Sequence, residues 1–118
     1  MAATEELANG TLVLLDPEEA KAIVDRGGAV LVDVRNPDEY EMAHIPGSLH
    51  HPLKEFDPAV LVKSSAKPII FLCAVGVRSK IAADRMLAAG HPSVAHLEGG
   101  LAAWLEAGLP VTTEADAA

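Results

Sequence analysis

The sequence predicts an α/β fold in which a mostly parallel sheet is covered by helices on both faces. Short apolar segments alternate along the chain with helical patterns that carry capping signatures. Segments 29–34 and 68–73 are almost continuously apolar, as expected of strands buried on both faces. Strands that alternate with helices favour parallel pairing. A chain of 118 residues, half of them hydrophobic, is long enough for one domain with its own core.

The expected elements follow in a regular order. The first helix has a clear start, because Asp16, Pro17 and Glu19 supply an N-cap, a proline at the first helical position and a glutamate at N3. Residues 36–39 repeat this signature. Strands are predicted at 11–15, 29–34, 48–51, 68–73 and 94–97. Helices are predicted at 17–26, at 37–42, from 57 onward, at 79–89 and at 101–107, with turns at 45–47 and 99–100. The domain is expected to span 1–118, with its core at about 12–111 and both ends frayed.

Composition excludes several classes of function. Seventeen acidic residues against nine basic ones give a net charge of −8, which repels nucleic acid and anionic lipid. No apolar run reaches the length of about 20 residues that a membrane span needs, and the first ten residues do not resemble a signal peptide. We therefore expect a cytoplasmic protein without nucleic-acid or membrane partners. One cysteine allows no internal disulfide and no CxxC motif.

That cysteine, Cys73, stands at the end of the predicted strand 68–73, where ligands bind in parallel α/β folds. The short loop of Ala74, Val75, Gly76, Val77, Arg78 and Ser79 leads from it into a helix. Such a loop curls around the sulfur, and its inward N–H groups would lower the thiol pKa and favour the nucleophilic thiolate. Arg78 could hold an anion or anchor the loop. The plain alternative is a buried core cysteine, which the Gly-x-Arg-Ser continuation disfavours.

Five blocks along residues 12–111 resemble the rhodanese-like sulfurtransferases. They read Val-Asp-Val-Arg at 32–35, Asp-Glu-Tyr at 38–40, His-Ile-Pro-Gly-Ser at 44–48, Cys-x-x-Gly-x-Arg-Ser at 73–79, and Leu-Glu-Gly-Gly at 97–100 followed by Trp104. The resemblance implies a three-layer fold with a five-stranded, mostly parallel central sheet. It implies that Cys73 accepts a sulfane sulfur as a persulfide and passes it to cyanide or a thiol, with no metal or organic cofactor. It also places Asp33 and Arg35 beside the site, where ion pairing would brace the loops.

The partners implied are a small-molecule sulfur donor, such as thiosulfate, and a thiol or cyanide acceptor. Because Ala74, Val75 and Val77 give the loop no charge of their own, capture of a dianion should be poor. The donor could instead be a low-molecular-weight or protein-bound persulfide. A second hypothesis is therefore a sulfur-relay module that carries persulfide between proteins with little free turnover. The chain is expected to be a monomer or a weak homodimer.

A phosphatase-like cysteine enzyme is a third hypothesis. Loops that surround a tetrahedral oxyanion need five residues between cysteine and arginine, and only four separate Cys73 from Arg78. The tighter loop suits a single sulfur atom.

The remaining polar residues favour structural roles. His50 and His51 are adjacent, so on a strand they point to opposite faces and cannot chelate together. The other histidines lack ligand spacing, so no metal site is expected. Lys80 and Asp84 are spaced for an ion pair on the solvated face of a helix.

Overall fold

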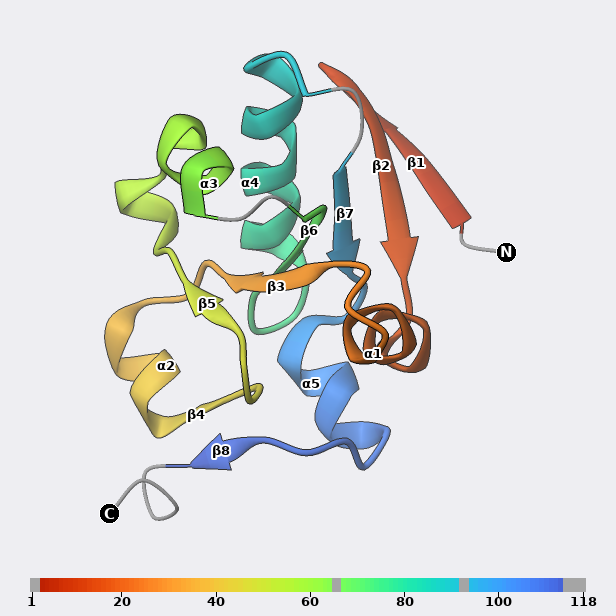
Figure 1. Ribbon diagram of the computed structural model, residues 1–118, viewed down its shortest axis with the longest axis vertical. Helices are drawn as coiled ribbons and strands as arrows, with labels where there is room; N and C mark the ends of the chain where they lie inside the picture. The colour runs from red at the N-terminus through yellow and green to blue at the C-terminus, as the bar shows by residue number, and fades with distance from the viewer. Residues whose placement is uncertain (1–2, 65–66, 92–93, 114–118) are drawn as a thin grey trace.

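The computed structural model describes residues 3–64, 67–91 and 94–113. A six-stranded sheet forms its centre, in the order β1-β2-β7-β6-β3-β5, and a two-stranded sheet joins β4 to β8 (Figure 1). The strands are β1 (Ala3–Leu7), β2 (Gly10–Leu15), β3 (Val30–Asp33), β4 (Ala43–His44), β5 (Leu49–His50), β6 (Ile69–Leu72), β7 (Val94–Leu97) and β8 (Thr112–Thr113). The helices are α1 (Pro17–Asp25), α2 (Pro37–Met42), α3 (Pro58–Ser64), α4 (Val77–Ala88) and α5 (Gly100–Glu106), with a 3₁₀ turn, η1 (Leu53–Glu55).

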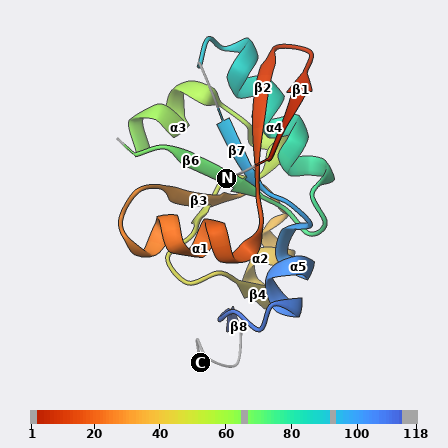
Figure 2. The same cartoon turned by 90° about the vertical axis from the view of Figure 1, so that its right-hand side faces the viewer.

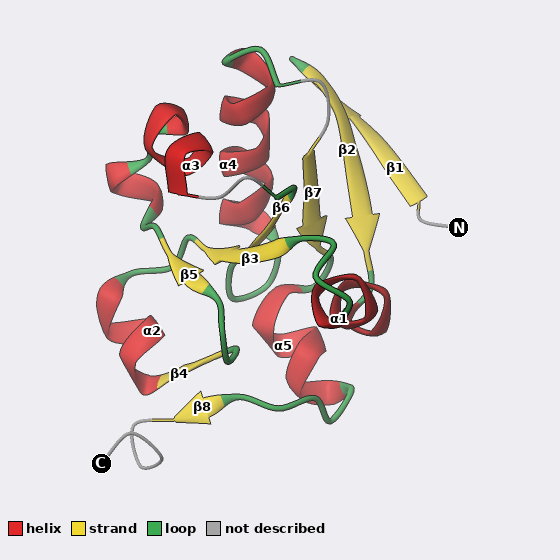
Figure 3. Cartoon of the chain, viewed as in Figure 1, coloured by secondary structure: helices red, strands yellow, loops and turns green. Residues whose placement is uncertain are grey.

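The predicted fold class is confirmed. Five strands from β2 to β5 pair in parallel, and helices lie on both faces of the sheet (Figures 2 and 3). One apolar cluster packs beneath α3 and α4 and includes Phe71 and Cys73. The other packs beneath α1 and α5 and includes Leu72 and Trp104. Neighbouring residues of β6 thus enter opposite layers, because successive side chains of a strand alternate between its faces.

The sixth strand differs from the sequence prediction. The first residues of the chain were expected to fray, but β1 pairs antiparallel with β2 from Ala3 opposite Leu14 to Leu7 opposite Gly10. Side chains anchor this hairpin to α4, since Glu5 accepts a bond from Lys80 and Asn9 bonds to Asp84. The Lys80–Asp84 pair predicted within α4 is therefore wrong. Each side chain instead bonds to the hairpin.

The C-terminal end also differs. Thr112 and Thr113 lie in the tail expected to fray, yet they pair with β4 as β8. The rest of that predicted tail, 114–118, lies outside the described residues.

Local signals explain where α1 and α4 begin. Asp16 and Glu19 form the capping box at the start of α1, with their reciprocal bonds at 2.8 and 3.0 Å. Helix α4 begins at Val77, two residues before the predicted start, because Gly76 adopts a left-handed conformation with φ 104° and acts as its N-cap.

Within the described part of the chain, no helix combines the length and apolar character that crossing a membrane requires.

Replacing Phe71 with alanine should destabilise the protein by about 3–5 kcal/mol, because a fully buried aromatic ring leaves a cavity when it is removed. Urea unfolding monitored by circular dichroism measures the change. Leu105→Ala is the control, since Leu105 is half exposed on α5 and its truncation should cost about 0.5 kcal/mol or less. Equal losses for the two variants would contradict the assignment of Phe71 to the core.

Candidate active site

The loop between β6 and α4 encloses the sulfur of Cys73. The side chain is 1% exposed, and the Gly76 amide donates a hydrogen bond to Sγ at 3.1 Å. Ser79, in the first turn of α4, places its hydroxyl oxygen 3.5 Å from the same sulfur. Of the predicted loop residues, Gly76 and Ser79 therefore contact the sulfur of Cys73, which directly follows β6 at the carboxyl end of that strand.

The loop lowers the pKa of the buried Cys73 thiol. Burial by itself raises the pKa of the Cys73 thiol, but hydrogen bonds to the sulfur outweigh it and lower the pKa below the ordinary value. The donors are the Ser79 hydroxyl and the amides of Ser79, Gly76 and Val75. The loop thus favours the thiolate, which is the nucleophilic form of cysteine.

Helix α5 holds the loop in this orientation. Its first-turn amides at Leu101 and Ala102 donate to the carbonyls of Cys73 and Ala74, at 2.8 and 3.1 Å. These amides would otherwise have no partner, because the first N–H groups of a helix lack intrahelical acceptors. The approach requires glycine at position 100, where a Cβ would lie 2.4 Å from the Cys73 oxygen. Figure 1 shows the loop beside the start of α5.

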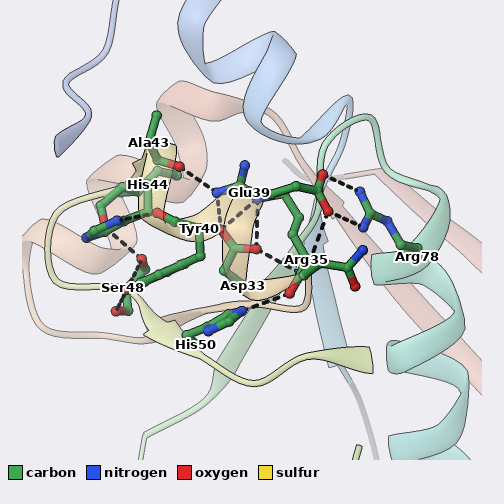
Figure 4. A network of polar contacts seen from close by, with 11 residues as sticks. Asp33, Arg35, Glu39, Tyr40, Ala43, His44, Ser48, His50 and Arg78 are labelled. Carbon is green, nitrogen blue, oxygen red and sulfur yellow. Dashed lines mark hydrogen bonds and ion pairs between the residues drawn. The ribbon is translucent and has the colours of Figure 1, made fainter. Parts of the chain in front are cut away.

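Arg78 binds a carboxylate on another helix and so anchors the loop. Its two terminal nitrogens bind the Glu39 carboxylate at 2.7 and 3.0 Å, which ties α4 to α2 (Figure 4). The hydrogen bond from Arg78 lowers the pKa of Glu39 to about 2, although partial burial opposes the change. Of the two roles that the sequence left open for Arg78, this geometry favours anchoring.

Asp33 and Arg35 form a buried ion pair, as expected of bracing residues. Two nitrogens of the guanidinium contact the carboxylate at 2.8–3.0 Å, and Arg35 also donates to the Ala43 carbonyl at 2.7 Å (Figure 4). Asp33 alternates with Val32 along β3 and so belongs to the layer of α1 and α5, whereas Cys73 belongs to the opposite layer. The pair therefore contacts the C-terminal end of α2, the helix whose first turn carries Glu39.

His44 and His50 sandwich the ring of Tyr40. The stacked rings lie 4.0 and 4.4 Å from it between centroids. His50 also bonds through Nε2 to the Arg35 carbonyl at 2.8 Å, and His51 accepts a bond from the Asp57 amide. The two adjacent histidines thus have separate structural contacts. Among residues 3–64, 67–91 and 94–113, no three His, Cys, Asp or Glu side chains are grouped so that they could hold a metal ion.

The outer side of the loop borders a cavity of about 620 Å³ between α4 and the β1–β2 hairpin. Val75, Val77 and Ile81 line it with large exposed apolar surfaces. Glu98 also borders this cavity, and Trp104 is buried in packing.

Two contacts were missed from the sequence. Glu39 was interpreted only as a capping residue, and His96 only as an ordinary histidine. His96 is buried, and its Nδ1 lies 2.9 Å from the Ser79 hydroxyl that contacts Cys73. No local pattern indicates either contact, because the partners are 39 and 17 residues apart.

The fold and this loop agree with the comparison to known families. The sequence model of the family described as the rhodanese-like domain matches residues 16–107 of this chain. The chain belongs to the rhodanese-like domain family, and the resemblance stated from the sequence motifs is confirmed.

Curated relatives indicate a sulfurtransferase family. The chain is 36% identical over 93 residues to thiosulfate sulfurtransferase GlpE of Pseudomonas syringae, covering 76% of this chain and 84% of the relative. It is 35% identical over 100 residues to an uncharacterised protein of Synechocystis sp., covering 85% of this chain but only 56% of the relative's length.

Solved structures share the fold. A thiosulfate sulfurtransferase from Pseudomonas aeruginosa is 31% identical with a TM-score of 0.76, over 86% of this chain and 20% of that one. A protein of unknown function from Rhodopseudomonas palustris, described as a possible tyrosine phosphatase, is 33% identical with a TM-score of 0.71. That match covers 84% of this chain and 83% of the other.

Replacing Gly100 with alanine should displace the cysteine loop, because the new Cβ would collide with the Cys73 carbonyl. Gly108→Ala is a matched control, since Gly108 also has a positive φ but no atom near the added Cβ. The control should lose about 1–2 kcal/mol from backbone strain. Gly100→Ala should lose more stability in urea unfolding and should also raise the pKa of Cys73, measured by the pH dependence of alkylation. Matching behaviour of the two variants would contradict the proposed clamp.

The Glu39–Arg78 pair should make stability depend on acid pH. Because the pKa of Glu39 falls from 4.5 to about 2 on folding, the contribution of the pair is complete above pH 4.5. It should then be lost as the pH falls toward 2. Urea unfolding at pH 7 and pH 3 should therefore show a smaller drop for Glu39→Gln than for the unchanged protein. Glu41→Gln, an exposed carboxylate on the same helix, should leave the drop unchanged.

Proposed function

We propose that this chain is a sulfurtransferase in which Cys73 carries a sulfane sulfur as a persulfide. The observation that carries the proposal is the cradle of three loop amides and the Ser79 hydroxyl around Sγ, which lowers the pKa of a buried thiol. Its match to the rhodanese-like domain and its relatives named thiosulfate sulfurtransferase support this chemistry.

The reaction needs two displacements at sulfur. The Cys73 thiolate attacks the outer sulfur of thiosulfate, the S–S bond of the donor breaks, and sulfite leaves with the bonding electron pair. Cyanide or a thiolate then attacks the outer sulfur of the persulfide, and the Cys73 thiolate leaves. The inward amides stabilise negative charge on the bound sulfur in both steps. Because the thiol is already acidic, the sequence of steps needs no general base and no cofactor.

The surroundings of the loop favour a persulfide over thiosulfate as donor. Val75 and Val77 are 62% and 65% exposed and uncharged, and the guanidinium of Arg78 is bound by Glu39. A dianion would meet loop amides but no free charge from Arg78. We therefore expect weak thiosulfate binding and a neutral or monoanionic persulfide donor in the cytoplasm.

A protein-to-protein sulfur relay is the second candidate. The observation that favours it is the apolar surface of Val75, Val77 and Ile81, which lies beside the loop that would deliver the sulfur. In this role, partner proteins would take the place of small-molecule donors and acceptors.

The phosphatase hypothesis has less support, despite the description of the Rhodopseudomonas palustris structure as a possible tyrosine phosphatase. In a phosphatase built on a cysteine–arginine loop, the guanidinium binds the phosphate at the reaction centre. Arg78 comes one residue too early for a loop that surrounds a tetrahedral oxyanion, and Glu39 already occupies its nitrogens.

Cys73→Ser should abolish thiocyanate formation from thiosulfate and cyanide, because the hydroxyl cannot form the persulfide. The unchanged protein should show turnover that falls as the pH drops below the pKa of Cys73. Mass spectrometry after exposure to a persulfide donor should find 32 Da added to the unchanged chain, the mass of one sulfur atom, and none to the variant.

The outcomes separate the candidates. A persulfide on Cys73 without thiocyanate formation favours the relay. Sulfur transfer that persists in Cys73→Ser, or the absence of any persulfide on Cys73, contradicts the proposed function. Cysteine-dependent hydrolysis of an aryl phosphate would support the phosphatase instead.

A further inference from the structure

A buried chain of three side chains leads away from the reactive sulfur. Cys73 Sγ lies 3.5 Å from Ser79 Oγ, and Ser79 Oγ lies 2.9 Å from His96 Nδ1. Ser79 is 0% exposed and His96 is 2% exposed. The three side chains come from different elements: Cys73 follows β6, Ser79 lies on α4 and His96 lies on β7. His96 pairs in register with Phe71, two residues before Cys73, so β7 runs beside the strand that leads to the cysteine. The mechanism above uses Ser79 but leaves His96 without a role.

The pKa of His96 lies below its ordinary value, which favours the neutral imidazole at neutral pH. Burial lowers the pKa of His96, and the positive charge of Lys80 on α4 lowers it further. Glu98, after β7, and Glu5, on β1, oppose this shift without reversing it. On the sulfur side, Cys73 and Arg78 interact electrostatically, and this interaction raises the pKa of Arg78. A neutral imidazole carries one proton, so one ring nitrogen donates and the other accepts.

The Ser79 hydroxyl has a single hydrogen and two neighbours that could take it. If the hydrogen points to His96 Nδ1, the proton of the imidazole lies on Nε2, and the hydroxyl cannot donate to the sulfur. If the hydrogen points to Cys73 Sγ, the oxygen is free to accept a bond from Nδ1–H. Only the second arrangement stabilises a thiolate.

The other ring nitrogen distinguishes the two arrangements. His96 Nε2 is buried and has no hydrogen-bond partner among the described residues. A proton on Nε2 would therefore leave a buried donor unsatisfied, while a proton on Nδ1 leaves only an unused lone pair. In protein backbones, buried donors without a partner are the rarer of these two cases.

We propose that His96 is a positioning residue that donates from Nδ1 to Ser79 and so directs the hydroxyl hydrogen of Ser79 at Cys73. This inference deepens the proposed function and rests on it only in taking Cys73 as the reactive sulfur. The hydrogen bond stabilises the thiolate that attacks the donor and the same thiolate when it leaves the persulfide.

Because Cys73 is the single cysteine, the pH dependence of its alkylation by iodoacetamide reports the thiol pKa directly. His96→Leu should raise that pKa and reduce the thiolate fraction at neutral pH by about threefold to tenfold, since hydrogen bonds to charged groups are among the strong ones. His96→Asn should keep the pKa close to that of the unchanged protein, because its amide N–H can replace Nδ1–H. In a Ser79→Ala background, His96→Leu should have no further effect.

Equal increases in His96→Leu and His96→Asn would overturn the proposal, because the ring would then act through packing. No change in His96→Leu, or an undiminished effect in the Ser79→Ala background, would also overturn it.

Nitrogen NMR of the unchanged protein gives a measurement that needs no folded variant. A proton on Nδ1 of His96 at a pH where Cys73 is ionised supports the proposal, and a proton on Nε2 contradicts it. None of these results depends on sulfur transfer, so failure of the proposed function would be seen separately.

Discussion

The contact between the start of α5 and the cysteine loop is the constraint on which the site depends. Two amides of α5 bind the carbonyls of Cys73 and Ala74, so the loop carbonyls turn outward and its amides turn toward the sulfur. The contact is possible because Gly100 has no Cβ to strike the loop. Without inward donors, burial would raise the thiol pKa and leave a neutral, poorly reactive cysteine. The Gly-Gly pair and the last helix therefore contribute to the chemistry of a residue 27 positions earlier.

The charged side chains near this loop neutralise one another. Asp33 pairs with Arg35, and Glu39 pairs with Arg78, so both guanidinium groups are bound to carboxylates. The favourable field at the sulfur then comes from the Ser79 hydroxyl and from peptide N–H groups, whose dipoles are fixed by the fold. These groups stabilise a negative charge on the sulfur of Cys73. The rim formed by Val75 and Val77 is exposed and uncharged.

Much of the fold could be predicted because its signals are local. Capping at Asp16 and Asn36, the apolar strand at 68–73 and the glycine-rich turns are each contained within a few consecutive residues. Strand β1 was missed because Thr4, Glu5 and Glu6 do not form an apolar pattern. It is an edge strand whose structure comes from pairing with β2 and from side-chain bonds to α4. Strands β4 and β8 are two residues each and pair residues that are 68 and 70 positions apart, which no local pattern reports.

The sequence by itself determined the α/β class, the family, and the position of Cys73 at the end of a buried strand before a short loop. These follow from hydrophobic patterning and motif spacing, which act along neighbouring residues. The tertiary structure alone decided that Arg78 meets Glu39, that Lys80 meets Glu5, and that His96 lies behind Ser79. Those contacts depend on strand register and on how α2, α4 and β7 pack around the sheet. Register and packing are set by the collective burial of two apolar layers, so they are encoded by the whole chain and by no single segment.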